Sequence, residues 1–408
     1  MSRQMMQTKP TPHSSTLGQI PRSIWTLGFV SMFMDISSEI VHSLLPMFLV
    51  TSLGASATMV GLVEGIAEAT TPIVKMFSGA LSDYLGNRKW LAVIGYSMGA
   101  LSKPLFALAP TAGIVLAVRV ADRIGKGVRG APRDALVADI TPTHLRGAAY
   151  GLRQSLDTVG AFLGPLLAVG LMLLWADNFR RVFWVAVVPG LAAVALLIFS
   201  IREPARQTGV KRVNPMTVEN LRKLSRPYWG VVFIGTVFSL ARFSEAFLVL
   251  RAMQGGIPVA LVPLVMVAMN VVYSISAYPS GKLADSTNHT KLLAIGLTVL
   301  FASDIVVAHG NQWPVVLLGV ALWGLHMGLT QGLLTTMVAH AAPSDLKGTA
   351  FGLFNLMTGL VTLVASLVAG ELWDRLGASA TFYAGAGFCL LTLCALAIGG
   401  GLRRKNAF

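Results

Sequence analysis

The sequence predicts an all-α integral membrane protein, with twelve transmembrane helices arranged as two pseudo-symmetric bundles of six. Three observations predict this fold class. Long apolar runs alternate with short polar breaks, basic residues gather in alternate loops, and the first half of the chain resembles the second. Together they describe a chain that crosses a bilayer many times and contains an internal duplication.

The apolar runs set the number of spans. The 408 residues are 54% hydrophobic and only 12% charged, about half of the charged fraction usual in soluble proteins. A helix that crosses a bilayer needs about twenty mostly apolar residues. Segments 182–200, 292–307 and 382–398 meet or approach this length, and about twelve comparable segments lie between polar breaks. This composition excludes a soluble α/β enzyme.

The basic residues indicate orientation rather than a nucleic-acid partner. The formal net charge is +14, but the Lys and Arg residues gather in alternate loops. The intervening loops 51–58, 109–113 and 309–313 contain none. Positively charged loops remain in the cytoplasm. We therefore expect a multi-pass protein of a bacterial inner (cytoplasmic) membrane, with both termini cytoplasmic and no nucleic-acid partner.

The two halves of the chain share motifs in the same order. Residues 79–83 match 281–285, and residues 142–152 match 343–353 without a gap. Parallel repeats of six spans are one way in which secondary transporters build a central substrate path. We therefore expect a cytoplasmic tail over residues 1–21, a six-helix bundle over 22–200, a cytoplasmic linker over 201–226, a second six-helix bundle over 227–402 and a cytoplasmic tail over 403–408.

A polar segment after the second span has the sequence GALSDYLGNRK, from Gly79 to Lys89. Gly79 permits the close approach of helices, and Gly86 allows a tight turn. Asp83 lies near a helix end, where it can pair with a basic group or a helix N-terminus. Arg88 and Lys89 hold the turn on the cytoplasmic side.

This segment resembles the most diagnostic motif of the major facilitator superfamily, a family of secondary transporters. A degenerate copy ends at Asp285 in the second half, without the basic turn. The resemblance covers nearly the whole chain and implies two bundles that rock about a central site, opening it to one side at a time. It also implies a cytoplasmic gate, for which the candidates are Gly79, Asp83, Gly86, Arg88, Lys89, Arg123 and Asp285.

Small residues and a proline punctuate the fifth span. Gly151, Gly160, Gly164 and Pro165 have a spacing similar to a motif of the antiporter branches of this superfamily. Small residues let helices pack tightly, and Pro165 removes a backbone donor and bends the helix. An ordinary glycine-kinked membrane helix is the alternative. The resemblance favours export over uptake.

The fourth span ends in a strongly charged stretch that resembles an arginine-containing motif of the family. Arg119 and Arg123 lie four residues apart on one helix face, as do Asp122 and Lys126. Charged side chains at membrane depth are costly and usually face a cavity or a partner. We expect Arg119, the deepest, to be the functional arginine, and Arg123 and Lys126 to belong to a gate network.

The first two spans carry four carboxyl groups. Asp35 and Glu39 lie four residues apart, and so do Glu64 and Glu68. Four carboxylates on neighbouring helices cannot all ionise cheaply in a low dielectric, so at least one is expected to hold a proton near neutral pH. Asp35 and Glu39 are therefore the first candidates for proton and substrate binding. The alternative is structural pairing with Lys75, Lys103, Arg119 or the Arg242–Glu245 pair of the seventh span.

The second half has fewer charged candidates. Arg242 and Glu245 lie three residues apart in the seventh span and either belong to the substrate and proton site or pair with each other. Asp304 and His326 are isolated polar residues of the ninth and tenth spans. Each either lines the cavity or makes one structural hydrogen bond.

Several other chemistries lack a sequence signal. The seven His are scattered, both Cys fall in the last span, and no glycine-rich phosphate-binding loop is found. We therefore expect no cofactor, no metal site and no enzymatic activity.

The leading hypothesis is proton-coupled efflux of a small organic compound, such as a drug, siderophore or metabolite, by a monomer in the lipid bilayer. A proton entering from outside at Asp35 or Glu39 would displace the substrate. Two alternatives stay open: proton-coupled uptake of an organic acid or nutrient, and a membrane sensor that transports nothing.

Overall fold

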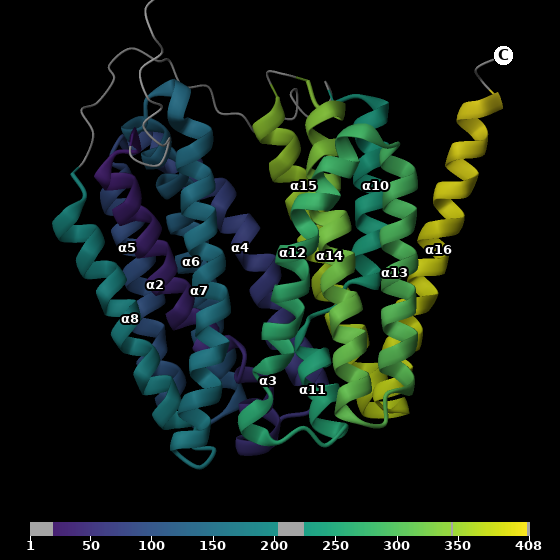
Figure 1. Cartoon of the computed structure of the whole chain (residues 1–408), viewed down its shortest axis with the longest axis horizontal. Coiled ribbons are helices and arrows are strands. Elements are labelled where there is room, and N and C mark those ends of the chain that lie inside the picture. The colour runs from purple at the N-terminus through teal and green to yellow at the C-terminus, as the bar shows by residue number, and fades with distance from the viewer. Residues whose placement is uncertain (1–18, 203–223, 344–345, 406–408) are drawn as a thin grey trace, which may run out of the picture.

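The computed structural model describes residues 19–202, 224–343 and 346–405, and its regular elements within these ranges are all helical (Figure 1). Most of the expected N-terminal tail and of the expected linker lies outside these ranges, as do residues 406–408 of the expected C-terminal tail, whereas residues 403–405 continue the last helix. The helices of the first half are α2 (Arg22–His42), α3 (Leu45–Met47), α4 (Ala57–Leu85), α5 (Arg88–Leu108), α6 (Ala112–Ile140), α7 (Arg146–Leu174) and α8 (Phe179–Ser200). Those of the second half are α10 (Arg226–Ala241), α11 (Ala246–Gln254), α12 (Leu264–Ser286), α13 (His289–His309), α14 (Trp313–Ala341), α15 (Lys347–Leu376) and α16 (Ala378–Lys405).

Twelve membrane-crossing units result when α2 is counted with α3 and α10 with α11, which confirms the predicted fold class. Ten of them have the length and the hydropathy of a membrane span. The other two, α4 and α6, are long enough but carry several charged residues. Charged side chains on a membrane helix usually face a cavity or a partner, so these two helices are expected to line a polar interior.

The packing repeats between the halves. In the first half α2 packs against α7 and α8, α6 against α4 and α5, and α5 against α8. In the second half α10 packs against α15 and α16, α14 against α12 and α13, and α13 against α16. The described chain begins and ends on the same side of the bundle (Figure 1). We call this side the terminal face and the other side the opposite face.

The most extensive contact between the halves joins α4 to α15. Glycines make this contact possible. A Cβ atom on Gly61 of α4 would lie 2.2 Å from the carbonyl oxygen of Ser366, and one on Gly370 of α15 would lie 2.6 Å from the Cα atom of Thr58. Small residues at such positions let two membrane helices touch along their backbones.

The first span of each half is broken at a corresponding place. The helix α2 ends at His42, and a turn at Ser43 and Leu44 precedes α3. The helix α10 ends at Ala241, and residues 242–245 are non-helical before α11 begins. Non-helical backbone at membrane depth is tolerated where it is buried in protein or lines a polar cavity. The two breaks therefore mark the region between the halves in which such a cavity is expected.

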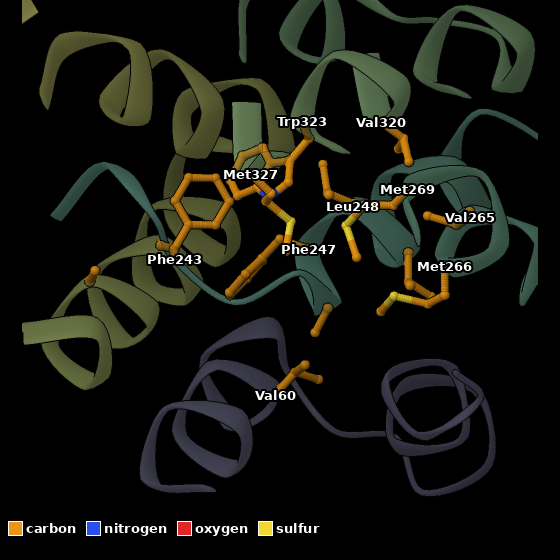
Figure 2. Packing of buried hydrophobic residues seen from close by; sticks show 14 of the residues in the cluster. Val60, Phe243, Phe247, Leu248, Val265, Met266, Met269, Val320, Trp323 and Met327 are labelled. Carbon is orange, nitrogen blue, oxygen red and sulfur yellow. The ribbon is translucent and has the colours of Figure 1, made fainter. Parts of the chain in front are cut away.

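A layer of buried apolar side chains lies between the halves (Figure 2). Part of it belongs to α11, which lies toward the opposite face (Figure 1). Val60 near the start of α4 contributes from the first half, and Phe247 and Met266 contribute from the second. The ring of Phe247 packs edge-on against that of Phe243, at 5.6 Å between centroids. Because Val60, Phe247 and Met266 are at most 2% exposed, the layer seals this side of the interior.

Candidate functional site

A cavity with two adjoining lobes lies between the halves. The first lobe, of about 630 Å³, is lined by α2, α4, α6 and α7 of the first half and by α12 of the second. The second lobe, of about 590 Å³, is lined by the same first-half helices except α7, and by α10, α14, α15 and the break after α10. Both lobes include Glu39, Thr71 and Lys126. Cavities of this size suit drug-sized molecules.

Two of the predicted carboxyl groups, Asp35 and Glu39, line the first lobe. Their helix is in close contact with α7. A Cβ atom on Gly160 would lie 3.0 Å from Asp35 Cβ, and one on Gly164 would lie 2.6 Å from Glu39 Cβ. The fifth-span glycines thus set the position of both carboxyl groups. A Cβ on Gly151 would meet nothing within 4 Å, so that glycine has no such role.

A chain of polar contacts runs from Glu39 into the wall of the cavity. Nδ1 of His42 lies 3.3 Å from a Glu39 carboxylate oxygen, and Nε2 lies 3.5 Å from Oε2 of Glu64. The same Oε2 accepts a 2.7 Å hydrogen bond from Arg119. The side chains of Glu64 and Arg119 are each 1% exposed. His42 therefore connects a carboxyl of the cavity to a buried ion pair.

Arg119, expected to be the functional arginine, lies behind the wall and lines neither lobe. Its neighbour Arg123, one turn along α6, lines the second lobe instead. Asp122, which lies four residues before Lys126 on α6, is bonded to α5. Asp122 accepts hydrogen bonds of 2.7 Å from Lys103 and 3.0 Å from Ser102, both on α5.

Several charged side chains on the cavity wall have no ion-pair partner among the described residues. Glu68 and Lys126 are exposed to the cavity and, among the described residues, neither forms an ion pair. In the second half, Arg242 and Glu245 line the second lobe from the break in the seventh span. They form no ion pair with each other at 4.0 Å or less. Charges of both signs are thus available to a ligand from both halves.

Of the expected gate residues, Gly86, Arg88 and Lys89 lie at the terminal face, whereas Arg123 lines the second lobe. Gly86 ends α4 with φ +64°, the left-handed conformation that the tight turn requires. Arg88 forms an ion pair with Asp139, and Lys89 donates a 2.8 Å hydrogen bond to the carbonyl of Ile198. Both contacts tie the turn to other helices of its own half.

Three further expected gate residues are less well placed by the structure. A Cβ on Gly79 would lie 3.4 Å from Ala131, an ordinary contact. The side chains of Asp83 and Asp285 lie outside the described part of the structure, although both residues belong to helices. Nearby on α7, Arg153 and Asp157 form an ion pair along one helix, and Asp157 lines the first lobe.

Asp304 and His326 do not line either lobe. Both are fully buried within the second half. His326 makes one hydrogen bond, from Nδ1 to the carbonyl oxygen of Gly296 at 3.0 Å. Asp304 makes none with either oxygen. Within the described ranges, no group of three or more His, Cys, Asp or Glu side chains could hold a metal ion.

Two features of the site were missed from the sequence. The first is His42, which lies three residues after Glu39 on the same helix face; this spacing was a usable signal. The second is the aromatic wall that Phe238, Phe243 and Trp323 give to the second lobe. Aromatic residues are common in apolar spans, so their sequence positions do not distinguish a cavity wall from lipid-facing or packed surfaces.

The chain was compared with known proteins. Residues 27–366 match the model of the Major Facilitator Superfamily. An MFS-type transporter of Methanocaldococcus jannaschii is 30% identical over 380 residues, which cover 92% of this chain and 94% of the relative. The quinolone resistance protein NorA of Staphylococcus aureus is 22% identical over 360 residues, which cover 86% of this chain and 90% of NorA.

Solved structures agree on the fold. A mutant of the nucleoside transporter NupG has a TM-score of 0.79 at 12% identity, with 92% of this chain and 99% of that chain covered. The peptide transporter POT in complex with sulfate also has a TM-score of 0.79, at 15% identity, with 94% and 95% covered. At these identities the likeness concerns the fold alone. With the family match over most of the chain, it follows that this protein is a membrane transporter that belongs to the Major Facilitator Superfamily.

Proposed function

We propose that this protein exports a small polar organic compound from a bacterial cytoplasm in exchange for protons, by alternating access of the cavity between its halves. The observation that carries the proposal is the charged cavity itself. It is shared by both halves, and its wall includes Asp35, Glu39 and Glu68 together with Lys126 and Arg242. A ligand held there touches both bundles, so its binding can respond to their rocking.

The proposed orientation places the terminal face in the cytoplasm, because basic residues gather in the loops of that face. The interior is sealed toward the opposite face by the layer that contains Val60 and Phe247. Residues that line the first lobe, such as Lys75 of α4 and Gln154 of α7, lie closer to the terminal face than Val60 does. This arrangement corresponds to a state that accepts substrate from the cytoplasm.

The proposed proton site is the group of Asp35, Glu39 and His42. Glu39 and His42 are in contact, and His42 also reaches Glu64. Histidine and carboxyl side chains in such a chain can hold a proton and pass it on. A proton bound here changes the charge of the cavity wall, and therefore the affinity for a charged substrate.

Export is proposed rather than uptake for two reasons. The glycine and proline spacing of the fifth span is similar to that of antiporter branches, and Gly160 and Gly164 contact the backbone beside Asp35 and Glu39. In addition, NorA, a relative over most of the chain, is named for quinolone resistance.

The test is a proton-flux assay on the purified protein in liposomes with a pH-sensitive dye inside. A chemically varied panel of cations, anions, zwitterions and neutral compounds would be added under a fixed proton gradient. We expect at least one compound to move opposite to the protons. Movement in the same direction as the protons would make the protein an uptake symporter. If no compound of the panel exchanges for protons or shows counterflow, the result would favour the alternative that the protein is a membrane sensor that transports nothing.

A further inference from the structure

We propose that Asp304 is a second proton-binding site of this transporter, located in the second half behind the wall of the cavity. The proposed coupling group of Asp35, Glu39 and His42 lies entirely in the first half. A site at Asp304 would give each half a proton acceptor of its own. This inference goes beyond the proposed function, because it concerns a residue that touches neither lobe.

The environment of Asp304 is that of a neutral acid. The residue lies on α13 with 0% exposure, and neither carboxyl oxygen has a hydrogen-bond partner. It forms no ion pair with any residue that the structure describes. An ionised carboxylate that is buried without a partner is strongly destabilised, because it has lost its hydration and gained nothing in return. A bound proton removes this cost, so the carboxyl is held in its protonated form.

The fold makes room for this carboxyl group. A Cβ atom on Gly385 of α16 would lie 2.7 Å from Oδ2 of Asp304. The same Cβ would lie 3.0 Å from Cε1 of Phe243. Glycine at this position thus leaves room on α16 both for the Asp304 carboxyl group and for the ring of Phe243, which lines the second lobe.

The groups around Asp304 favour a proton over a metal cation. Calcium and magnesium ions require about six oxygen ligands. Two titratable side chains on the helices packed against α13 are fully buried, Cys389 of α16 and His326 of α14. Tyr383, Cys394 and His340 also lie on these helices, and Tyr383 contacts His309 at the end of α13. Arg251 of α11 donates hydrogen bonds to the backbone carbonyls of Val307 and Ala308. Arg242 and Glu245, in the same break as Phe243, line the cavity instead. Among the residues that the structure describes, no group of His, Cys, Asp and Glu side chains around Asp304 could hold a metal ion.

Two further unsatisfied polar groups lie at or beside the wall of the second lobe. The ring of Trp323 lies 5.5 Å from that of Phe243 and 6.5 Å from that of His326. Nε1 of Trp323 and Nε2 of His326 are buried and have no hydrogen-bond partner. Phe243 and Trp323 both form part of the lobe wall. When these rings move, water can enter and hydrogen-bond to the unsatisfied nitrogen atoms of Trp323 and His326. Such water would connect Asp304 to the cavity.

The direct test is infrared spectroscopy of the full-length protein in lipid, which needs no substrate. The wild type minus Asp304→Asn difference spectrum is expected to show the carbonyl stretch of a protonated carboxyl group at neutral pH. On transfer to D₂O this band is expected to shift, because the site exchanges protons with the cavity. Asp177→Asn, at an exposed loop position, is the matched control and should leave the band in place.

Two outcomes overturn the proposal. Absence of the band from the difference spectrum would mean that Asp304 is ionised. A band that does not shift in D₂O would mean a sealed structural carboxyl. A second variant, Gly385→Ala, places a methyl group against Oδ2 and should shift the same band in the wild-type background. This guards against misfolding of Asp304→Asn.

The coupling role has its own measurement. With a compound that drives proton exchange in liposomes, Asp304→Asn should lower the number of protons exchanged per molecule by about one, while the compound still moves. An unchanged ratio would refute the coupling role. The infrared result does not depend on transport, so failure here is distinguishable from failure of the proposed function.

Discussion

The carboxylate of Asp374, near the end of α15 in the second half, accepts hydrogen bonds from the backbone N–H and the side-chain hydroxyl of Thr58, at 2.8 and 2.7 Å. Thr58 lies at the start of α4 in the first half, and the N–H of Ala57 donates to the other oxygen at 3.0 Å. Helix N-termini favour anions because their N–H groups are unsatisfied and their dipole is positive there. One half of the protein thus caps a helix of the other.

Removal of this cap is expected to loosen the opposite face. Hydrogen bonds to charged groups contribute about 1.5–3 kcal/mol each, so Asp374→Ala should raise the population that is open there roughly tenfold or more. Spin labels at Ser52 and Leu376, with Cys389 and Cys394 replaced, would report the distance across this face. A new, longer component is the expected result.

The control for this experiment is Asp177→Asn, an exposed carboxyl in the loop between α7 and α8, which should leave the distances unchanged. If Asp374→Ala also leaves them unchanged, the cap does not contribute to closure.

The glycines of α7 give a matched pair of variants. A Cβ on Gly164 would lie 2.6 Å from Glu39 Cβ, whereas one on Gly151 would meet nothing. Overpacking typically costs about 1–3 kcal/mol, so Gly164→Ala should lower the thermal unfolding midpoint and reduce transport. Gly151→Ala should be neutral or slightly stabilising, because alanine is the better helix former by about 1 kcal/mol. Equal effects of the two variants would show that α2 and α7 are not in close contact.

The Glu64–Arg119 pair is expected to be essential to folding rather than to substrate binding. Removal of one partner of a buried ion pair typically costs about 3–5 kcal/mol, because the other charge is left uncompensated. Glu64→Gln should therefore lower the unfolding midpoint strongly, and Glu64→Gln with Arg119→Met should recover much of the loss. Arg375→Gln, which removes an exposed ion pair with Glu371, should cost at most about 1 kcal/mol. A double variant as unstable as Glu64→Gln alone would contradict this interpretation.

Much of the fold could be predicted from the sequence, because the thickness of a bilayer fixes the length of each apolar segment that crosses it. Apolar runs of span length, basic loops on one side and the repeated motifs together predicted twelve spans in two halves. The positions of Asp35 and Glu39 on the cavity also agree with the expectation that charged groups in a span face a polar interior.

The pairings inside the site could not be predicted, for a physical reason. Spacing along one helix shows which residues share a face, and it placed Asp122 and Lys126 on the same face. Contacts between helices depend on how each helix is rotated and shifted against its neighbours. The rotation of these helices brings Asp122 to Lys103 of α5 and Glu64 to Arg119 of α6. Arg119 was only one of several possible partners that the sequence offered for the carboxyl groups. The helix break at Arg242 likewise depends on tertiary contacts, such as the 3.1 Å bond from the N–H of Ser244 to Ser366.

The central claim is that protons bound at Asp35 or Glu39 drive the movement of substrate through the cavity. Its most direct test is proton flux in liposomes with a transported compound, measured for the wild type, Asp35→Asn and Glu39→Gln. We expect one or both substitutions to reduce compound-driven proton flux at least tenfold, while Asp177→Asn behaves as the wild type. Coupled flux that survives both substitutions unchanged would contradict the account.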